Sequence, residues 1–463
     1  MMKMMSLEKI ATACNGVLYA SEDKKNAVAV SVTLDSRQVI EGSLFIATRG
    51  ERVDGHDFIE AVYEKGALCV VSERELKEPK GAYILVKDSF QALKDIAAYY
   101  RSVLNVKVVG ITGSVGKTST KEMIASVLEQ KYKVLKTAGN FNNEVGLPLT
   151  ILNIREEHEI AVVEMGISDF GEMHRLSAIA RPDICVITNI GQCHLENLKS
   201  REGILKAKSE IFDFLQSDGA ICLNGDDDLL STVKEIKGIQ PLFFGLDQKN
   251  AIYATDIVSR GLEGTSCRLH RQGEIIETLI PIPGGHMVLN ALAATAVATI
   301  LGLSAEMIRQ GIMETQSLSG RSHLIKTEKN LVIDDCYNAN PMSMRAAIEL
   351  LSYANTRRVA ILGDMFELGD NSDRLHYETG TYAIASEIEV LVLVGENARQ
   401  MSDAADAYLG SHPERVCEKH YFTDREEAMR NLPSILREQD TILIKASHGM
   451  GFQKIVDMIT KEP

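Results

Sequence analysis

The sequence predicts an α/β protein of three domains, and three observations carry that prediction. The chain has 463 residues, enough for about three domains at roughly 100–200 residues each. Short apolar runs alternate with helical patterns along most of its length, which is typical of sheets joined by helices. At residues 106–130 an apolar run, a glycine-rich loop and a helix follow one another directly. We expect domains at residues 1–103, 104–318 and 319–463.

Composition excludes several classes of protein. The chain is 45% hydrophobic and 25% charged, with a net charge of -14, so general binding to nucleic acid or to an anionic membrane is not expected. No apolar run approaches the ~20 residues of a membrane span, and the first residues lack the pattern of a signal peptide. The eight cysteines form no C-x-x-C pair, which indicates reduced, mostly buried thiols. We therefore expect a cytoplasmic protein without membrane insertion.

The first domain is expected to be a small α/β unit. Strand-like runs occur at "GSLFIAT", "GALCVVS" and "GAYILVK", with short helical patterns between them. A polar loop, "RGERVDGHDF" at residues 49–58, interrupts this series. Each run is bounded by turn residues, as short strands usually are.

The central domain is expected to contain a P-loop-type parallel sheet. "VKVVGIT" is continuously apolar, as is typical of a parallel strand buried on both faces. A helix should follow from Lys117 to about Gln130. "EIAVVEMG", "DICVITNI" and "GAICLNGDD" repeat the pattern of an apolar strand with a polar end. "HMVLNALAATAVATILG" is apolar nearly all round and predicts a buried helix.

The third domain is expected to be Rossmann-like and doubly wound. The helical sequence pattern ends at "LSGR", residues 318–321. A second series of apolar, strand-like runs follows in "LVIDDCYNANP", "RRVAILGDM", "EVLVLVG" and "TILIKASHG". No G-x-G-x-x-G accompanies it, so the dinucleotide fingerprint of that fold is missing.

The loop "GITGSVGKTST" at Gly110 to Thr120 predicts a phosphate-binding site. The common spacing G-x-x-x-x-G-K-[ST] requires a glycine at position 111, which is Ile111 here, and the glycine lies two residues later at Gly113. The strand before it and the helix after it are both in place, so backbone N–H groups and the helix N-terminus can meet phosphate oxygens. Lys117 can reach the β- and γ-phosphates, and Thr118 can place a hydroxyl on Mg²⁺.

Mg²⁺ prefers oxygen ligands, and an acid at a neighbouring strand end often helps to hold it in P-loop enzymes. Glu164, which ends "IAVVE", has that position. His194 follows the strand "ICVITNI", and taken alone it reads more readily as a structural loop histidine. Lys206 and Lys208 in "LKAKSEIF" read, taken alone, as a solvated helix face.

A phosphate loop indicates a nucleotide and not a reaction. No N-K-x-D sequence occurs, which argues against a GTPase. Two further α/β domains beside the nucleotide domain suit a ligase that holds two other substrates. A regulatory switch or a ligand-binding module without ligase activity is the alternative from another class of protein.

Taken together, the motifs resemble the Mur ligase family, the ATP-dependent amide-forming enzymes of peptidoglycan synthesis. The resemblance extends over nearly the whole chain, in the family's order. It rests on "TLDSRQVIEGSLFIATRGERVDGHDF", "GITGSVGKTST", "NFNNEVGLPLT", "VVEMG", "TNIGQCHLENL", "AKSEIF", "NALAATAVA", "GRSHLIK", "DDCYNANPMSM" and "ILGDMFELG". The last two are similar to the branch that adds D-alanyl-D-alanine.

The resemblance implies a role for each matching residue. Lys117, Lys208, His194 and Glu164 would be catalytic, and Thr118, Glu164, His194 and Lys208 would hold metal. Lys208 matches the lysine that carries a carbamate in the family. The ATP site would comprise Gly113, Ser114, Val115, Gly116, Lys117, Thr118, Ser119, Asn143, Asn290 for adenine, Arg321 for the γ-phosphate and Asp335 for ribose. Ser36 and Arg37 would bind the uridine nucleotide, and Asn338 and Asn340 are candidates for the peptide substrates.

The implied reaction joins D-alanyl-D-alanine to UDP-N-acetylmuramoyl-tripeptide (UDP-MurNAc-tripeptide) at the expense of ATP, with two Mg²⁺ and a monomeric enzyme expected. A sister ligase that adds an amino acid to the UDP-muramoyl dipeptide, or glutamate to folate, is the nearest alternative. "DSR" argues against folate, and the absence of D-N-P-R argues against the amino-acid-adding relative. The third residue of the tripeptide, L-lysine or meso-diaminopimelate, stays open. The chain differs from the family pattern at Met287, Ala446 and His448.

Overall fold

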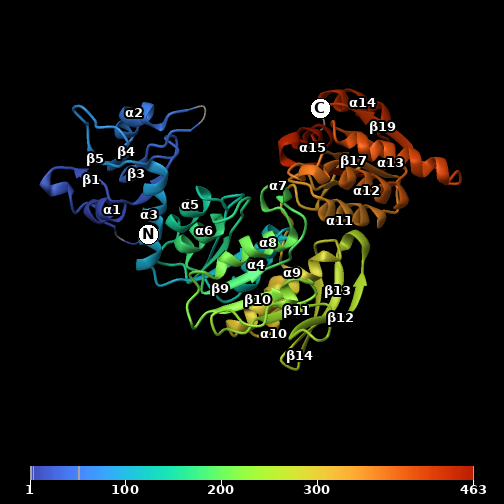
Figure 1. Ribbon diagram of the computed structural model, residues 1–463, viewed down its shortest axis with the longest axis horizontal. Coiled ribbons are helices and arrows are strands. Elements are labelled where there is room, and N and C mark those ends of the chain that lie inside the picture. Colours follow the sequence, from blue (N-terminus) through green and yellow to red (C-terminus); the bar gives the residue numbers. More distant parts are fainter. Residues whose placement is uncertain (1–2, 4, 51–52, 462–463) are drawn as a thin grey trace.

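The protein forms three β-sheets that follow one another along the chain, as the computed structural model shows (Figure 1). The structure describes residues 3, 5–50 and 53–461. Two residues of the expected polar loop, Glu51 and Arg52, lie outside the described residues, as do the outermost residues of the first and last expected domains. The three sheets confirm the expected three-domain α/β architecture.

The first sheet has five strands in the order β1-β5-β4-β3-β2. Strands β2 to β5 are parallel, and β1 pairs antiparallel with β5 at the edge. The expected apolar runs form β3, β4 and β5, which are almost entirely buried. The elements are α1 (Leu7–Ala13), β1 (Val17–Tyr19), β2 (Ser31–Thr33), β3 (Ser43–Ile46), α2 (Ile59–Glu64), β4 (Cys69–Ser72), β5 (Ala82–Leu85) and α3 (Ser89–Val103).

The central sheet has nine strands in the order β14-β13-β12-β11-β10-β9-β6-β8-β7. Its strands are β6 (Lys107–Thr112), β7 (Val134–Lys136), β8 (Ile160–Glu164), β9 (Ile184–Ile187), β10 (Ala220–Asn224), β11 (Leu242–Gly245), β12 (Ile252–Ser259), β13 (Thr265–Arg271) and β14 (Glu274–Ile280). Its helices are α4 (Lys117–Leu128), α5 (Gly146–Leu152), α6 (Glu172–Ala180), α7 (Leu195–Leu198), α8 (Arg201–Ser209), α9 (His286–Ile300) and α10 (Ala305–Met313). Strands β6 to β12 are parallel.

The order of the central strands creates a crevice at β6. The chain leaves β6 for β7 and β8 on one side, then crosses to β9 and the later strands on the other. Such a switch point opens a crevice at the carboxyl ends of the strands, where ligands bind in open α/β sheets. The phosphate loop directly follows β6 and therefore lies in this crevice.

The central sheet is not wholly parallel, which corrects the expectation for this domain. Strands β12, β13 and β14 form an antiparallel meander at one edge. Gln272 and Gly273, both with positive φ (46° and 80°), form the two-residue turn between β13 and β14, which is the conformation that tight hairpins require. Burial alternates along most of β13 and β14, and alternation of apolar and polar residues is the sequence signal from which such half-buried strands can be predicted.

The third sheet has the order β15-β16-β20-β17-β18-β19, parallel except for β15. Alternate residues of its strands pack against α11–α13 on one face and against α14 and α15 on the other, which confirms the doubly wound fold. Its strands are β15 (His323–Lys326), β16 (Leu331–Asp334), β17 (Arg358–Gly363), β18 (Val390–Val394), β19 (Glu418–Phe422) and β20 (Thr441–Lys445). Its helices are α11 (Pro341–Ser352), α12 (Ser372–Ala385), α13 (Ala398–Ser411), α14 (Arg425–Ile435) and α15 (Gln453–Thr460).

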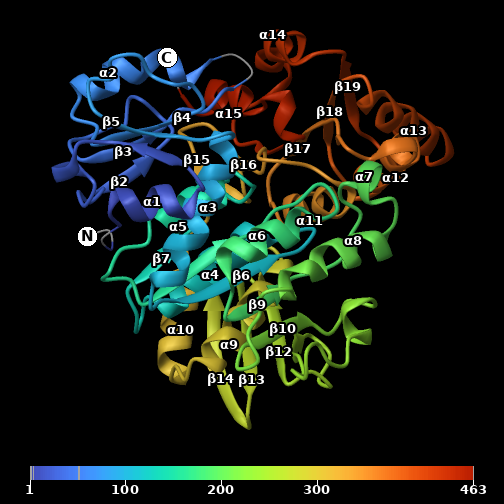
Figure 2. The same cartoon turned by 60° about the vertical axis from the view of Figure 1, so that its left-hand side comes forward.

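Helix α3 attaches the first sheet to the central one. It packs against α5 and α6 of the central domain (Figure 2), and buried residues on both sides of it form one continuous core. At its end Arg101 donates to the carbonyl oxygen of Ala180 at 2.8 Å and forms an ion pair with Asp183 at 3.1 Å. The helix is therefore held at several points along its length.

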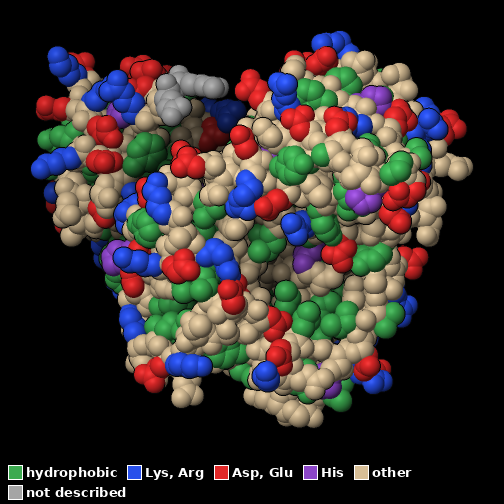
Figure 3. Space-filling view, turned by 45° about the vertical axis from the view of Figure 1, so that its right-hand side comes forward, with side chains coloured by type: hydrophobic (Ala, Val, Ile, Leu, Met, Phe, Trp, Pro, Cys, Tyr) green, Lys and Arg blue, Asp and Glu red, His purple; other side chains and the backbone are tan. Residues whose placement is uncertain are grey.

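Two composition-based expectations can be compared with the structure. All eight cysteines are free, and seven of them are buried, which confirms the expectation that most are buried. Within the described part of the chain, no helix is long and apolar enough to cross a membrane. On the face shown in Figure 3, basic and acidic side chains are interspersed and form no broad basic surface.

Candidate active site

The phosphate loop connects β6 to α4 through two glycines with positive φ. Gly113 has φ 151° and Gly116 has φ 83°. A Cβ atom on Gly113 would overlap Thr188 Oγ1, and one on Gly116 would lie 3.3 Å from Asn290 Oδ1. Glycine is therefore required at position 113 both by the backbone conformation and by the close approach of the strand-end residue Thr188.

The loop is tied to the end of β9. The N–H groups of Ser114 and Val115 donate to the backbone and side-chain oxygens of Asn189, both at 3.0 Å, and Thr188 Oγ1 donates to the Val115 carbonyl at 2.7 Å. The first N–H groups of α4, from Lys117 onward, have no partner within the helix. These N–H groups at the helix N-terminus, rather than those of Ser114 and Val115, are the donors available to an anion.

Lys117 folds back over the loop. Its Nζ donates to the Gly113 carbonyl at 2.9 Å and to the Ser114 carbonyl at 3.4 Å. These carbonyls hold the ammonium group at the mouth of the loop, where phosphate oxygens would replace them as partners. Thr118, on the first turn of α4, is 4% exposed.

Glu164 lies at the end of β8, beside Ile111 of β6, and is 1% exposed. Its Oε1 accepts a hydrogen bond from Asn142 Nδ2 at 2.8 Å, whereas its buried Oε2 has no partner. A buried carboxylate oxygen without a partner is costly. A cation in the cavity would remove that cost, so the site fits the expected Mg²⁺.

His194 is the N-cap residue immediately before α7 and has a left-handed backbone (φ 52°). Its Nδ1 lies 2.6 Å from Oε2 of Glu367, which belongs to the third domain, and this contact lowers the pKa of the Glu367 carboxyl. The pair joins the central domain to the loop after β17. Glu367 itself comes from the motif "ILGDMFELG".

Lys208 lies on α8 and is fully buried, and its Nζ has no hydrogen-bond partner. Burial, with a smaller contribution from the charge of Lys117, lowers the pKa of Lys208 to about 8. This side chain is therefore not the solvated helix-face lysine that the local sequence would indicate. Within the described residues, no group of three or more His, Cys, Asp and Glu side chains forms a ready metal site.

Asn290 of α9 lies against the phosphate loop. Its Oδ1 accepts from Thr120 Oγ1 at 2.9 Å, and its Nδ2 lies 3.2 Å from the sulfur of Met287. Met287 is buried. The departure from the family pattern at Met287 thus places a thioether next to the asparagine amide.

The third domain contributes a second group of polar residues. The Arg321 guanidinium lies 4.0 Å from the centre of the Tyr337 ring. Asp335 accepts from the Ser322 N–H at 2.8 Å through Oδ1, and its Oδ2 forms an ion pair with Lys445 at 2.6 Å. Lys445, in "LIKASHG", was not singled out in the sequence. It is a buried cation that holds the Asp335 carboxylate through this ion pair.

The two asparagines considered for the peptide substrates are engaged within the protein. Asn338 Oδ1 accepts from the N–H of Ala339 at 2.9 Å, and its carbonyl accepts from Lys445 Nζ at 2.9 Å. Asn340 caps α11, and its Oδ1 accepts from the Ser343 N–H at 2.9 Å. The Asn340 side chain therefore has a structural role in this arrangement.

One cavity of about 1240 Å³ unites these groups. It is larger than the ~300–1,000 Å³ of most ligand pockets, so it has room for more than one substrate. Residues from the central domain and the third domain line it. Among the sequence-predicted residues these are Ser114, Val115, Gly116, Lys117, Thr118, Ser119, Asn143, Glu164, His194, Asn290, Arg321, Asp335, Asn338 and Asn340.

Four sequence-predicted residues do not line this cavity. Gly113 and Lys208 are packed behind its wall, next to lining residues. Ser36 and Arg37 belong to the first domain, where the exposed Arg37 forms an ion pair with Asp35 at 2.8 Å. The structure therefore gathers most of the residues predicted for ATP in one cavity and leaves the two predicted for the uridine nucleotide outside it.

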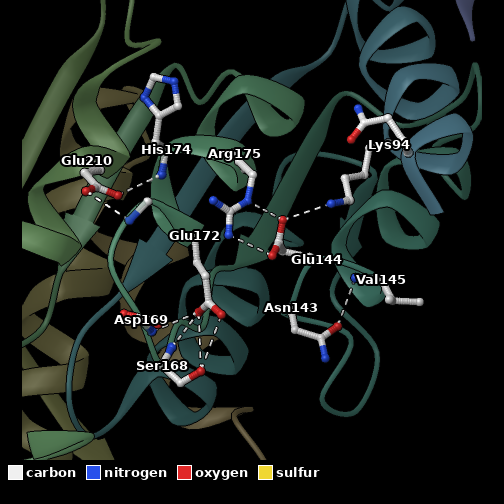
Figure 4. Close-up of polar contacts among 12 residues, drawn as sticks. Lys94, Asn143, Glu144, Val145, Ser168, Asp169, Glu172, His174, Arg175 and Glu210 are labelled. Atoms are coloured by element: carbon white, nitrogen blue, oxygen red, sulfur yellow. Dashed lines mark hydrogen bonds and ion pairs between the residues drawn. The ribbon is translucent and has the colours of Figure 1, made fainter. Parts of the chain in front are cut away.

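The loop "NFNNEVG" supplies residues that the sequence did not single out. Asn142, and not Asn143, contacts Glu164. Asn143 Oδ1 instead accepts from the N–H groups of Val145 and Gly146, at the start of α5. Figure 4 shows Glu144 pointing toward Arg175 and Lys94 from this loop. Two successive asparagines carry no local signal that tells which one meets the carboxylate.

Comparison with family models matches three successive parts of the chain. Residues 29–101 match the Mur ligase family catalytic domain, residues 111–298 the Mur ligase middle domain, and residues 320–448 the Mur ligase glutamate ligase domain.

Full-length relatives and solved structures agree with these matches. The chain is 38% identical over 463 residues to the UDP-N-acetylmuramoyl-tripeptide–D-alanyl-D-alanine ligase of Bacillus subtilis (strain 168), covering 99% of each chain. A crystal structure of MurF from Acinetobacter baumannii matches with a TM-score of 0.88 at 31% identity, over 99% of this chain and 100% of that one. MurF ligase from Thermotoga maritima, in complex with ADP, matches with a TM-score of 0.80 at 29% identity, over 93% and 97%. The chain belongs to the Mur ligase family.

Proposed function

We propose that this protein is an ATP-dependent ligase that joins D-alanyl-D-alanine to UDP-MurNAc-tripeptide. The products are UDP-MurNAc-pentapeptide, ADP and phosphate, and the reaction serves peptidoglycan precursor synthesis. The observation that carries the proposal is the cavity of about 1240 Å³ in which the phosphate loop faces polar residues of the third domain. The full-length similarity to ligases of this name supports the choice of substrates.

In this proposal ATP binds at the phosphate loop. The first N–H groups of α4 and the Lys117 ammonium meet the phosphates. Asn143 and Asn290 line the same pocket, and Arg321 and Asp335 reach the γ-phosphate and the ribose from the third domain. Lys445 holds the Asp335 carboxylate in place through their 2.6 Å ion pair.

Two Mg²⁺ are expected, held by Thr118, Glu164, His194 and a modified Lys208 together with phosphate oxygens. The free Oε2 of Glu164 supports this assignment. When bound, Mg²⁺ supplies positive charge that offsets the charge of the transferring phosphoryl group. His194 would leave Glu367 to take up this role.

We propose that Lys208 carries a carbamate. Its amine adds to CO₂ and loses a proton to solvent, so a buried cation becomes an anion beside Mg²⁺. Only a neutral amine can add to CO₂, and the lowered pKa of about 8 makes the neutral form accessible near neutral pH. Bicarbonate labelled with ¹³C tests this, since a carbamate signal should appear in the wild type and be absent from Lys208→Arg.

The chemistry begins at the carboxylate of the tripeptide, which is a poor electrophile. Transfer of the γ-phosphoryl group gives an acyl phosphate, and the dipeptide amine then attacks its carbonyl carbon and releases phosphate. The protein contributes mainly by holding the reactants together and excluding water. We expect the third domain to move against the central one as ATP and substrates bind.

The remaining assignments are also proposals. We place the domain limits near residues 103 and 318, which is supported by the end of α3 at Val103 and the start of the third sheet at His323. Ser36 and Arg37 would bind the uridine nucleotide, and Asn338 and Asn340 stay candidates for peptide contacts. We also propose that the enzyme works as a monomer in the cytoplasm, where its eight free cysteines would stay reduced.

The test is phosphate release from ATP with UDP-MurNAc-tripeptide, with and without D-alanyl-D-alanine, followed by the mass of the product. Release that requires the dipeptide and yields the pentapeptide mass supports the proposal. Turnover with a single amino acid instead would reassign the chain to a sister ligase. Lys117→Ala serves as the inactive control, and the lysine- and diaminopimelate-containing tripeptides compared side by side identify the third residue.

A further inference from the structure

We infer that Glu144 is a positioning residue for the metal-binding carboxylate of Glu164. The inference rests on the Mg²⁺–nucleotide part of the proposed function and not on the identity of the ligated substrates. Glu144 lines the same cavity but contacts neither Glu164 nor the phosphate loop, so its effect on Glu164 is transmitted through the loop that carries it.

Both oxygens of the Glu144 carboxylate are bound by cations from two different helices. Arg175 of α6 donates through Nε to Oε1 at 2.6 Å and through Nη2 to Oε2 at 3.0 Å. Lys94 of α3 donates to Oε1 at 3.0 Å. Figure 4 shows the carboxylate between these two side chains. A two-pronged contact between arginine and a carboxylate is geometrically specific, so Glu144 is held in one place.

The same loop carries the residue that contacts Glu164. Asn142 lies two positions before Glu144, and its Nδ2 donates to Glu164 Oε1 at 2.8 Å. The Asn142 carbonyl accepts from the Gly166 N–H at 2.9 Å. A Cβ atom on Gly166 would lie only 3.0 Å from the Asn142 side chain, so the asparagine has little room to shift.

The consequence for the site concerns which oxygen of Glu164 is free. Because Oε1 is bound by Asn142, the carboxylate presents its unpartnered Oε2 to a cation. Residues that orient a metal ligand are worth about 10–100-fold in metal affinity. The contacts of Glu144 extend this support to α6 and to α3, the helix that joins the first domain to the central one.

A purely structural role would also explain why Glu144 is paired with two cations, so the test must separate that role from the positioning of Glu164. Glu122 of α4 provides a matched control. It is a poorly exposed carboxylate with two cationic partners, Lys121 at 2.9 Å and Lys136 at 2.7 Å, and it does not line the cavity.

The experiment measures ADP binding by calorimetry with and without MgCl₂, for the wild type, Glu144→Gln, Asn142→Ala and Glu122→Gln. We expect the gain in ADP affinity from Mg²⁺ to fall about 10-fold or more in Asn142→Ala and several-fold in Glu144→Gln. Binding of ADP without Mg²⁺ should be unchanged. Glu122→Gln should keep the full increase in ADP affinity caused by Mg²⁺, even where its urea midpoint falls as much as that of Glu144→Gln.

A double-mutant cycle tests whether Glu144 acts on Glu164 through its ion pair with Arg175. Arg175→Gln should reduce the Mg²⁺ gain like Glu144→Gln, and the double variant should lose no more than either single one. An unchanged Mg²⁺ gain in Glu144→Gln, or an equal loss in Glu122→Gln, would overturn the inference. Because ADP and MgCl₂ are the probes used, failure of the ligase assay would leave this result unaffected.

Discussion

Replacing Gly113 by alanine should destabilise the phosphate loop and weaken nucleotide binding. Alanine would have to adopt φ 151°, and its Cβ would overlap Thr188 Oγ1. Holding a residue in such a region costs ~1–3 kcal/mol. Displacing Thr188 also disturbs its 2.7 Å hydrogen bond to the Val115 carbonyl, worth ~0.5–1.5 kcal/mol. The expected loss of unfolding free energy is thus about 3 kcal/mol in total.

The assay is urea unfolding, together with calorimetric binding of ADP. The matched control is Gly285→Ala at the N-terminus of α9, where φ is −58° and no atom lies within 4 Å of the added Cβ. In Gly113→Ala the ADP affinity should fall about tenfold, because the loop that presents Lys117 moves. If Gly113→Ala is as stable as Gly285→Ala, the steric reasoning is wrong. If Thr188→Ala adds its full cost on top of Gly113→Ala, the overlap with Thr188 is not the cause.

Three further predictions follow from other parts of the molecule. Arg321→Ala should weaken ATP binding about tenfold, or ~1.4 kcal/mol, and leave ADP binding unchanged, because the proposal places Arg321 on the γ-phosphate; equal losses for both nucleotides in calorimetry would contradict that role. The hydrogen bonds from Arg175, whose effect is larger than that of burial, lower the pKa of Glu144 below 4.5 in the folded protein. The ionised Glu144 carboxylate therefore stabilises the fold fully above pH 4.5, and this stabilisation is lost as the pH falls through the lowered pKa of the folded state. Wild-type unfolding free energy should therefore drop more steeply below pH 4.5 than that of Glu144→Gln, and parallel curves would refute this. A fragment of residues 319–463 should unfold cooperatively in urea, since helices on both faces of its sheet form cores of their own; a fragment without a sigmoidal transition would refute the proposed limit.

The sequence determined the features that depend on local pattern. Continuous apolar runs correctly predicted the buried parallel strands, such as β6, β8 and β18. The nearly uniform apolar run at His286–Ile300 correctly predicted a buried helix. The phosphate loop was recognisable because its glycines, lysine and flanking elements are contiguous in the chain, so no distant contact is needed to form it.

Edge strands and meanders were harder to predict, because their pattern is shared with exposed loops. Strands β13 and β14 alternate between buried and more exposed residues over most of their length, the second half of β12 is exposed, and β15 and β19 contain no buried residue. Their pairing depends on neighbours elsewhere in the sheet rather than on intrinsic preference. The result is a mixed central sheet in place of the parallel one expected.

Only the tertiary structure decided how distant residues meet at the site. Asp335 gains Lys445 as an ion-pair partner from another strand, and His194 meets Glu367 across two domains. Lys208 changes from an apparent surface residue to a fully buried amine with a lowered pKa. These contacts arise from the packing of whole helices and sheets, which sets the distance between side chains far apart in sequence, and no local pattern encodes that distance.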